Sequence, residues 1–291
     1  NALEANTTAS NNTAVGFDSL KANTTGTNNV AVGYQALDAI TTASNSTAVG
    51  KSALSADTTG FNAAFGYSAG SGVTGTRNAA FGPSALGVAT TGDDNTAIGA
   101  NALLKATTSS DNTAVGAYSM SEMTTGTGNT AVGYSTLDAT TTVNYNTAMG
   151  HVALTTNTSG TENAAFGSQA LYANTTGNNN TGIGSQALYA STTAANNTAV
   201  GYQAGNAITT GDHNVMIGYQ AGTSSIDTTT GTKNVVVGSH CHTSVIAGAN
   251  QIVLGYDAVG SADGTITVGN SGTDSTMTLG GTTWSAPSDV R

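Results

Sequence analysis

The sequence predicts an all-β fold, a parallel β-solenoid (β-roll) built from coils of about 17 residues, and three observations support this prediction. A glycine recurs at steps of 17 residues through most of the chain, with two steps of 16, from Gly16 to Gly218. An asparagine usually stands four residues before that glycine. Thr, Asn, Val and Gly dominate the repeats, and these residues disfavour a helix. No helical periodicity persists along the chain.

One repeat, Asn29 to Leu37, reads NVAVGYQAL and shows how a coil forms. Strand alternation places Val30 and Val32 on one face and Ala31 on the other. Gly33 interrupts the strand, as glycine does where a chain bends or another backbone approaches closely. The following Thr-rich segment has the composition of a turn. We therefore expect two short strands around a glycine bend in each coil, followed by a Thr-rich return.

The composition excludes several classes of function. The formal charge is −10 and only six Lys and Arg are present, so the cation cluster that nucleic-acid binding needs is missing. No apolar run approaches the roughly 20 residues of a membrane span. The single cysteine, Cys241, excludes an intrachain disulfide framework. We expect neither nucleic acid nor membrane as a partner.

Stacking of the coils would align equivalent residues, and the repeated asparagines would then form a ladder of side-chain amides bonded along the stacking direction. We interpret this ladder as structural. Ser46 replaces asparagine once in the series, and Gln251 extends it. The ladder comprises Asn12, Asn29, Asn62, Asn78, Asn95, Asn112, Asn129, Asn146, Asn163, Asn180, Asn197, Asn214 and Asn234.

Alanine stands two positions before nearly every repeat glycine, as at Ala31 and Ala48. A small residue held at one site in successive coils suggests close approach by something else, and our hypothesis is an identical chain. Three copies wound about one axis would form a homotrimer. The number three does not follow from the periodicity, and a lateral dimer or a lone β-solenoid stays open.

The phrase NTAVGYQAL resembles repeats of trimeric bacterial adhesin heads and of bacteriophage tail fibres, over roughly residues 8 to 258. In both families short glycine-containing repeats form trimeric parallel β-rolls, although adhesin-head repeats are usually shorter. The resemblance implies a homotrimeric fibre shaft in a virion tail fibre. Its partners would be other virion tail proteins and a host cell-surface receptor, for example a glycan. The alternative it implies is an adhesin head on a bacterial surface.

The predicted domains are a repeat shaft, 1–258, and a Thr-rich C-terminal β segment, 259–291. The ending Ser288-Asp289-Val290-Arg291 resembles the junction before an endosialidase-type intramolecular chaperone, which assists trimer folding and then releases itself by cleavage. The resemblance implies cleavage between Ser288 and Asp289, with Ser288 as nucleophile. Apart from this autocleavage we do not expect an enzyme.

His240-Cys241-His242 is the one unusual local cluster. On a strand, His240 and His242 would point to the same side and Cys241 to the other. In a trimer, six inward imidazoles could hold one axial transition-metal ion. Phage fibre tips that resemble this chain use such a His-x-His site. The alternative is a pair of histidines on an irregular loop, and no other cofactor is expected.

Other candidate chemistry has a structural interpretation in this sequence. The acidic residues sit mostly in loop-like stretches, with no paired carboxylates of a glycosidase cleft. Adjacent threonines would point to opposite sides, which disfavours an ice-binding array. Tyrosines after the repeat glycine would form a broken aromatic column. We favour packing between coils or chains for this column over glycan binding; it comprises Tyr34, Tyr67, Tyr134, Tyr202, Tyr219 and Tyr256.

Overall fold

The computed structural model describes residues 1–281 apart from 89, 224–228 and 271–272. It divides into two units, Asn1–Asn146 and Thr147–Arg291, which are described separately below. Both units contain only strands and turns among the described residues. The predicted fold is confirmed: the chain is an all-β parallel β-solenoid of about 15 coils of about 17 residues.

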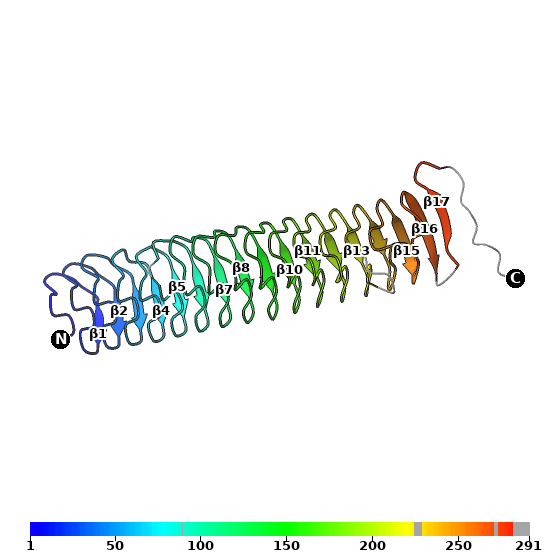
Figure 1. Ribbon diagram of the computed structural model, residues 1–291. Helices are drawn as coiled ribbons and strands as arrows, with labels where there is room; N and C mark the ends of the chain where they lie inside the picture. Colours follow the sequence, from blue (N-terminus) through cyan, green and yellow to red (C-terminus); the bar gives the residue numbers. More distant parts are fainter. Residues whose placement is uncertain (89, 224–228, 271–272, 282–291) are drawn as a thin grey trace. The chain divides into compact units, whose positions relative to one another are not determined.

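The first unit contains eight strands of three residues, which lie side by side in Figure 1. They are β1 (Thr13–Val15), β2 (Val30–Val32), β3 (Thr47–Val49), β4 (Ala63–Phe65), β5 (Ala79–Phe81), β6 (Thr96–Ile98), β7 (Thr113–Val115) and β8 (Thr130–Val132). Each strand pairs in parallel with the next, and equivalent residues face each other, as Ala14 faces Ala31.

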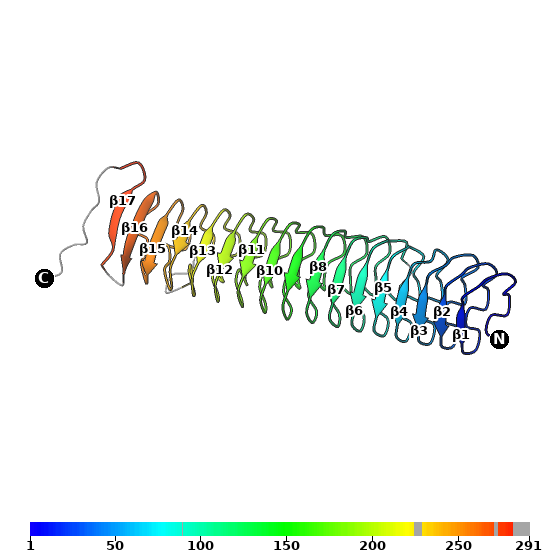
Figure 2. The same cartoon turned by 180° about the vertical axis from the view of Figure 1, so that it is seen from behind.

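The second unit continues the pattern and ends differently, as the view from behind in Figure 2 shows. Its strands are β9 (Thr147–Met149), β10 (Ala164–Phe166), β11 (Thr181–Ile183), β12 (Thr198–Val200), β13 (Val215–Ile217), β14 (Val235–Val237), β15 (Ile252–Tyr256), β16 (Thr265–Asn270) and β17 (Ser275–Thr278). Strands β9 to β16 pair in parallel with the same register. Strand β17 pairs antiparallel to β16 and so closes the parallel series.

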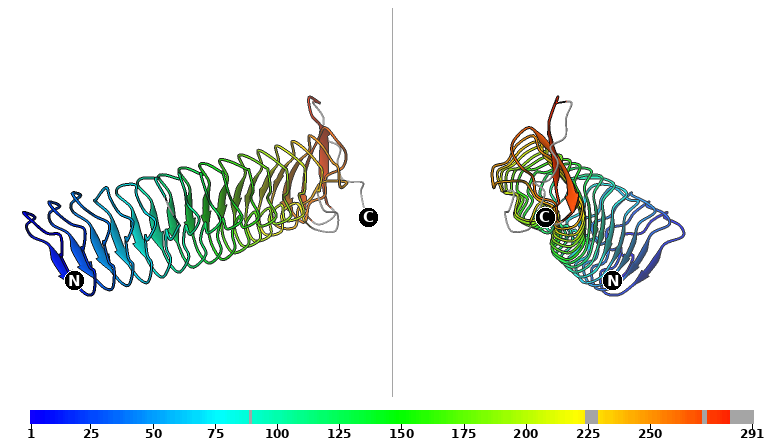
Figure 3. Two further views of the ribbon diagram at one scale, coloured as in Figure 1. Left: turned by 60° about the vertical axis from the view of Figure 1, so that its left-hand side comes forward. Right: turned by 90° about the vertical axis from the view of Figure 1, so that its right-hand side faces the viewer.

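The second strand expected in each coil is wrong. After the glycine bend the chain makes a turn in which Gln35 and Leu37 have φ values of 52° and 51°. Alternate residues in the left-handed region cannot continue an extended strand. The backbone of this turn still forms hydrogen bonds to the next coil: the Leu37 N–H donates to the Ala53 carbonyl at 3.1 Å. The coils of each unit therefore repeat as strand and turns (Figure 3).

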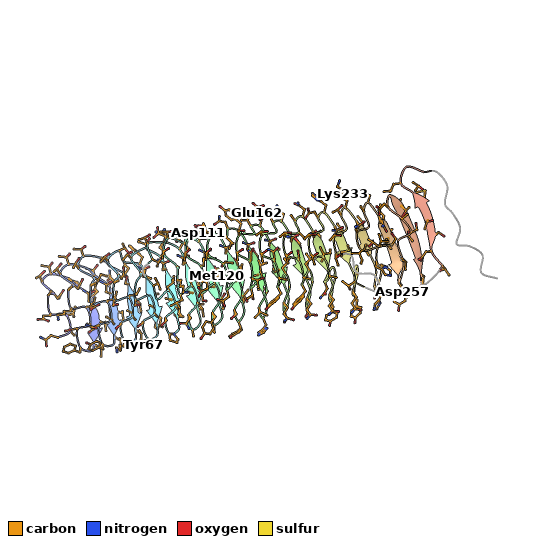
Figure 4. The ribbon with its side chains drawn as sticks, viewed as in Figure 1. Tyr67, Asp111, Met120, Glu162, Lys233 and Asp257 are labelled. Atoms are coloured by element: carbon orange, nitrogen blue, oxygen red, sulfur yellow. The ribbon has the colours of Figure 1, made fainter. Side chains whose placement is uncertain are left out.

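In most coils the interior is filled by the middle residue of the strand and a leucine of the turn. Ala31 and Leu37 are completely buried, and Met120 takes the leucine position in a later coil, inside the ribbon in Figure 4. The repeated alanine therefore packs inside its own chain. Its small size fits the narrow coil, so the argument for a neighbouring chain that rested on this alanine is wrong.

The repeat glycine is required by the backbone of the next coil. Gly33 has a φ of 139°, which residues with a side chain rarely adopt, and a Cβ there would collide with the Gly50 carbonyl oxygen. The close approach predicted for this glycine is thus confirmed, and the same contact recurs between Gly50 and Gly66.

Candidate binding surfaces and sites

The ladder asparagines lie inside the coils and join each coil to the next. Asn95 donates from Nδ2 to Asn78 Oδ1 at 3.1 Å and to the Ser109 carbonyl at 2.8 Å. Its own Oδ1 accepts from the backbone N–H and the Nδ2 of Asn112, both at 3.2 Å. In the second unit Asn180 and Asn197 repeat these bonds. These amides are buried and hydrogen-bonded between coils, which indicates a structural role.

In each unit, the first and third residues of the strands, β1–β8 in the first unit and β9–β15 in the second, form a surface that we call the outward face. The third position carries Val, Ile, Met, Phe or Leu in every one of these strands. Its side chains are only partly covered: Val15 is 57% exposed and Ile98 42% in the first unit, and Ile183 is 42% exposed in the second. An apolar row of this kind is the most extended candidate for a protein contact on either unit.

The residues after the repeat glycine form a broken aromatic column. Phe17 stacks on Tyr34 with ring centroids 5.6 Å apart and an interplanar angle of 12°. Tyr202 stacks on Tyr219 in the same way, at 5.3 Å and 19°. Within such pairs each ring covers one face of its neighbour, so the arrangement favours packing between coils.

A lysine replaces the aromatic residue once in this column. The Lys51 ammonium lies 5.8 Å from the Tyr34 ring centroid and 5.6 Å from that of Tyr67. Both distances fall within the range of a cation–π interaction. Tyr67 is 57% exposed and stands at the outer edge of the first unit in Figure 4. Ring contacts therefore join four successive coils through Phe17, Tyr34, Lys51 and Tyr67.

Sequence reasoning missed a glutamine ladder in the second unit. Gln186 donates to Gln169 at 2.9 Å, Gln203 donates to Gln186 at 2.7 Å, and Gln220 donates to Gln203 at 2.7 Å. These residues lie two positions after the repeat glycine, and their spacing of 17 is the signal that could have revealed them. Every bond joins one coil to the next, so the ladder has the same structural character as the asparagines.

The structure places His240 and His242 in different surroundings. His240 lies in the turn after Gly238, whereas His242 forms an isolated parallel bridge with Val259, so the two residues do not share one strand. The His240 ring contacts two rings of the aromatic column, with centroids 5.1 Å from Tyr219 and 6.1 Å from Tyr256. His242 occupies the leucine position of its coil and is 2% exposed, and its Nδ1 lies 2.9 Å from the Thr243 carbonyl.

Cys241 is buried, which contradicts the outward position expected for it. It occupies the alanine position of the turn, and its thiol donates to the Gly255 carbonyl at 2.7 Å. Burial raises the pKa of this thiol, which disfavours a reactive thiolate. Among the described residues, no group of three or more His, Cys, Asp or Glu could hold a metal ion. The axial metal at His240 and His242 stays a prediction.

The acidic residues are not all solvated loop charges. Asp57 is completely buried, and its two oxygens accept bonds from Ser46, Thr59, Gly60 and Asn62. At the surface, Arg77 forms a two-pronged ion pair with Asp94, with both N–O distances at 2.7 Å. Both carboxylates, those of Asp57 and Asp94, are bound by hydrogen-bond donors and do not form a pair with another carboxylate.

Ser288 and Asp289, the residues of the expected cleavage, lie outside the described residues. Within the part of the chain that is described, no helix is long and apolar enough to cross a membrane. No protein-family model matches this chain, and no curated protein matches it significantly. The class of this protein is accordingly defined by its fold, a parallel β-solenoid with an apolar outward face.

Proposed function

We propose that this chain is a structural and attachment protein, the shaft of a bacteriophage tail fibre or a similar virion appendage. Several copies share one axis, and the resemblance to tail-fibre repeats gives their number as three. The observation that carries the proposal is the outward face. Monomeric soluble proteins rarely expose long apolar rows, and a second copy is the partner that repeats with the same spacing.

The internal chemistry supports a mechanical role. Asparagine and glutamine ladders, like the ladder of Asn95 and the ladder of Gln203, place hydrogen bonds along the stacking direction in coil after coil. Such repetition makes a stiff spacer and leaves few residues for a unique active site. The expected partners are other virion tail proteins at one end and a host receptor, for example a glycan, at the other.

The second candidate is the head of a bacterial surface adhesin that binds host or matrix glycans or proteins along its side. The observation that favours it is the exposed aromatic column, since Tyr34 and Tyr219 are 45% and 49% exposed. Immunogold labelling of virions and of intact cells from the source separates the two. Labelled tail appendages support the fibre, whereas label confined to the cell surface supports the adhesin.

The assembly itself is tested by sedimentation equilibrium of the purified chain. We expect the mass of three copies, and a single-chain mass at micromolar concentration would contradict the proposal. I98E places a charge on the outward face and should shift the mass toward one copy without unfolding the coil. T108E is the control, because Thr108 is exposed and lies off that face.

A further inference from the structure

Two substitutions on the outward face always occur together. The third strand position carries Phe in β4, β5 and β10, and only in these three of β1–β15 does the first position carry Ala. The corresponding segments read NAAFG, whereas most other coils read NTAVG or a close variant. In the other strands the first position is Thr, Val or Ile. A larger residue at one position thus accompanies a smaller one at the other.

Nothing within a single chain requires this pairing. Phe65 and Phe81 stack on each other along the solenoid, with ring centroids 4.9 Å apart and an interplanar angle of 12°, and remain 39% and 37% exposed. Stacking of Phe on Phe is not the cause either, because Phe166 follows the same rule between Met149 and Ile183. A solvent-facing ring tolerates a large neighbour, so size matching indicates that the face is packed.

We propose that the outward face packs against a second copy of this chain in equal register, and that the Phe/Ala strands fix this register. The third position of one copy contacts the first position of its neighbour at the same coil, so each Phe ring lies over an Ala. This inference rests on the proposed self-association. Beyond that self-association, the inference says which strand positions of the two copies are in contact and which residues prevent one copy from shifting along the other by a coil.

The arrangement follows from the symmetry of the contact. A rotation axis along the solenoid brings unlike positions together: a two-fold axis sets the two facing strands antiparallel, and a closed ring of three joins the third position of one copy to the first position of the next. Either assembly matches large with small, and the mass of the assembly gives the number of copies. The first and third positions recur in all eight strands of the first unit, so the proposed contact would extend over every coil of that unit.

Register needs such a device because most coils are interchangeable. A slip by one coil would leave Thr against Val at most levels and so would cost little. It would also place Phe65 against Thr47 or Phe81 against Thr96, where no room is left for the ring. The three Phe/Ala coils therefore exclude the slipped assemblies that the remaining sequence permits.

Disulfide trapping between two tagged chains tests the register, in a C241A background that removes the native thiol. One chain carries T113C and the other V115C, which belong to the first and third positions of β7. We expect a mixed disulfide in high yield. The matched control combines T113C with V132C, one coil further along, and should give little product. Equal yields in both mixtures, or a dominant V115C–V115C product, would overturn the inference.

The size matching is tested by A79T, A79T/F81V and the wild type. A79T adds bulk beneath Phe81 of the neighbouring copy, and the dissociation constant of the assembly should rise roughly tenfold or more. A79T/F81V converts the coil to the common pattern and should recover most of this loss. Circular dichroism below the dissociation constant checks that the lone coil is unchanged. An unaltered dissociation constant in A79T would refute the size matching, whereas a chain that never associates would refute the proposed function itself.

Discussion

Ser46 donates a hydrogen bond of 2.8 Å to Oδ2 of the buried Asp57, and these two residues are a matched pair of exceptions in the repeat. Ser46 takes the place of a ladder asparagine. Asp57 takes the position that asparagine occupies in other coils, as at Asn157 and Asn174. The donors from Thr59, Gly60 and Asn62 all bond Oδ1, which leaves Oδ2 to the serine hydroxyl. The serine and the aspartate therefore stabilise each other.

S46A should lower the free energy of unfolding by about 2–3 kcal/mol, because it takes the hydroxyl donor away from a buried carboxylate oxygen. S46N/D57N should be nearly neutral, because it reproduces the asparagine pair of other coils. Chemical unfolding of the wild type, S46N, D57N and S46N/D57N measures the coupling between the two positions. Additive effects of the two substitutions would show that the two residues act independently.

Asn95 tests the internal ladder. N95A should destabilise the chain by about 2–4 kcal/mol, since it removes the amide that bonds Asn78 and Asn112 and leaves buried polar groups unsatisfied. N95S should cost less, because the Ser46 hydroxyl accepts a bond from the Asn62 N–H in the place of a ladder amide oxygen. Thermal unfolding provides the measurement. T108A, at an exposed site, is the control and should change stability by less than about 0.5 kcal/mol.

Gly33 tests the contact between neighbouring coils. G33A should destabilise by roughly 3 kcal/mol or more, because the Cβ would meet the Gly50 carbonyl and the backbone conformation is itself unfavourable for alanine. Gly264 also has a positive φ, 70°, but no described atom lies within 4 Å of the place where its Cβ would stand. G264A separates the two causes: a loss as large as that of G33A would mean that the contact is unimportant.

Two carboxylates should give opposite dependences of stability on pH. Burial raises the pKa of Asp38, and the neighbouring Asp18 adds to the effect. Ionisation of Asp38 therefore opposes folding: its contribution is favourable below the ordinary value of 3.8 and is lost as the pH rises through the raised pKa. D38N should raise the melting temperature at pH 7, and the gain should disappear in acid.

Asp94 provides the comparison. The hydrogen bond from the Arg77 guanidinium lowers the pKa of this carboxyl. Its contribution is present above 3.8 and is lost as the pH falls through the lowered pKa. D94N should therefore lower the melting temperature slightly at pH 7 and have no effect in strong acid. Scanning calorimetry across this range measures both variants, and the same sign for D38N and D94N would contradict these assignments.

The sequence predicts the coil well where one residue type has one physical role. Gly33 must be glycine because another backbone lies against it, so its spacing reveals the period of the fold. Leu37 is harder to place, because alternation suggests a strand while its left-handed backbone is imposed by contacts with the next coil. The sequence suggests that Ala31 contacts a neighbouring chain, whereas the structure buries it inside its own coil. The sequence alone does not separate the two, because a small residue fits a narrow interior as well as a contact between chains.

The candidate sites are less predictable for a related reason. His240 and His242 are separated by one residue, and their directions depend on whether that segment is a strand or a turn. Only the three-dimensional structure shows that His242 replaces a core leucine. The outward face, in contrast, is already implied by Val30 and Val32, which alternate with the buried Ala31.

The uniform pairing of equivalent residues, such as Ala97 with Ala114, has a consequence for how the gene can change. Deletion or duplication of one whole period leaves every remaining residue opposite its usual partner. Chains that are longer or shorter by whole periods should therefore fold in the same way. In the proposed assembly of identical chains, each such change would alter every subunit alike.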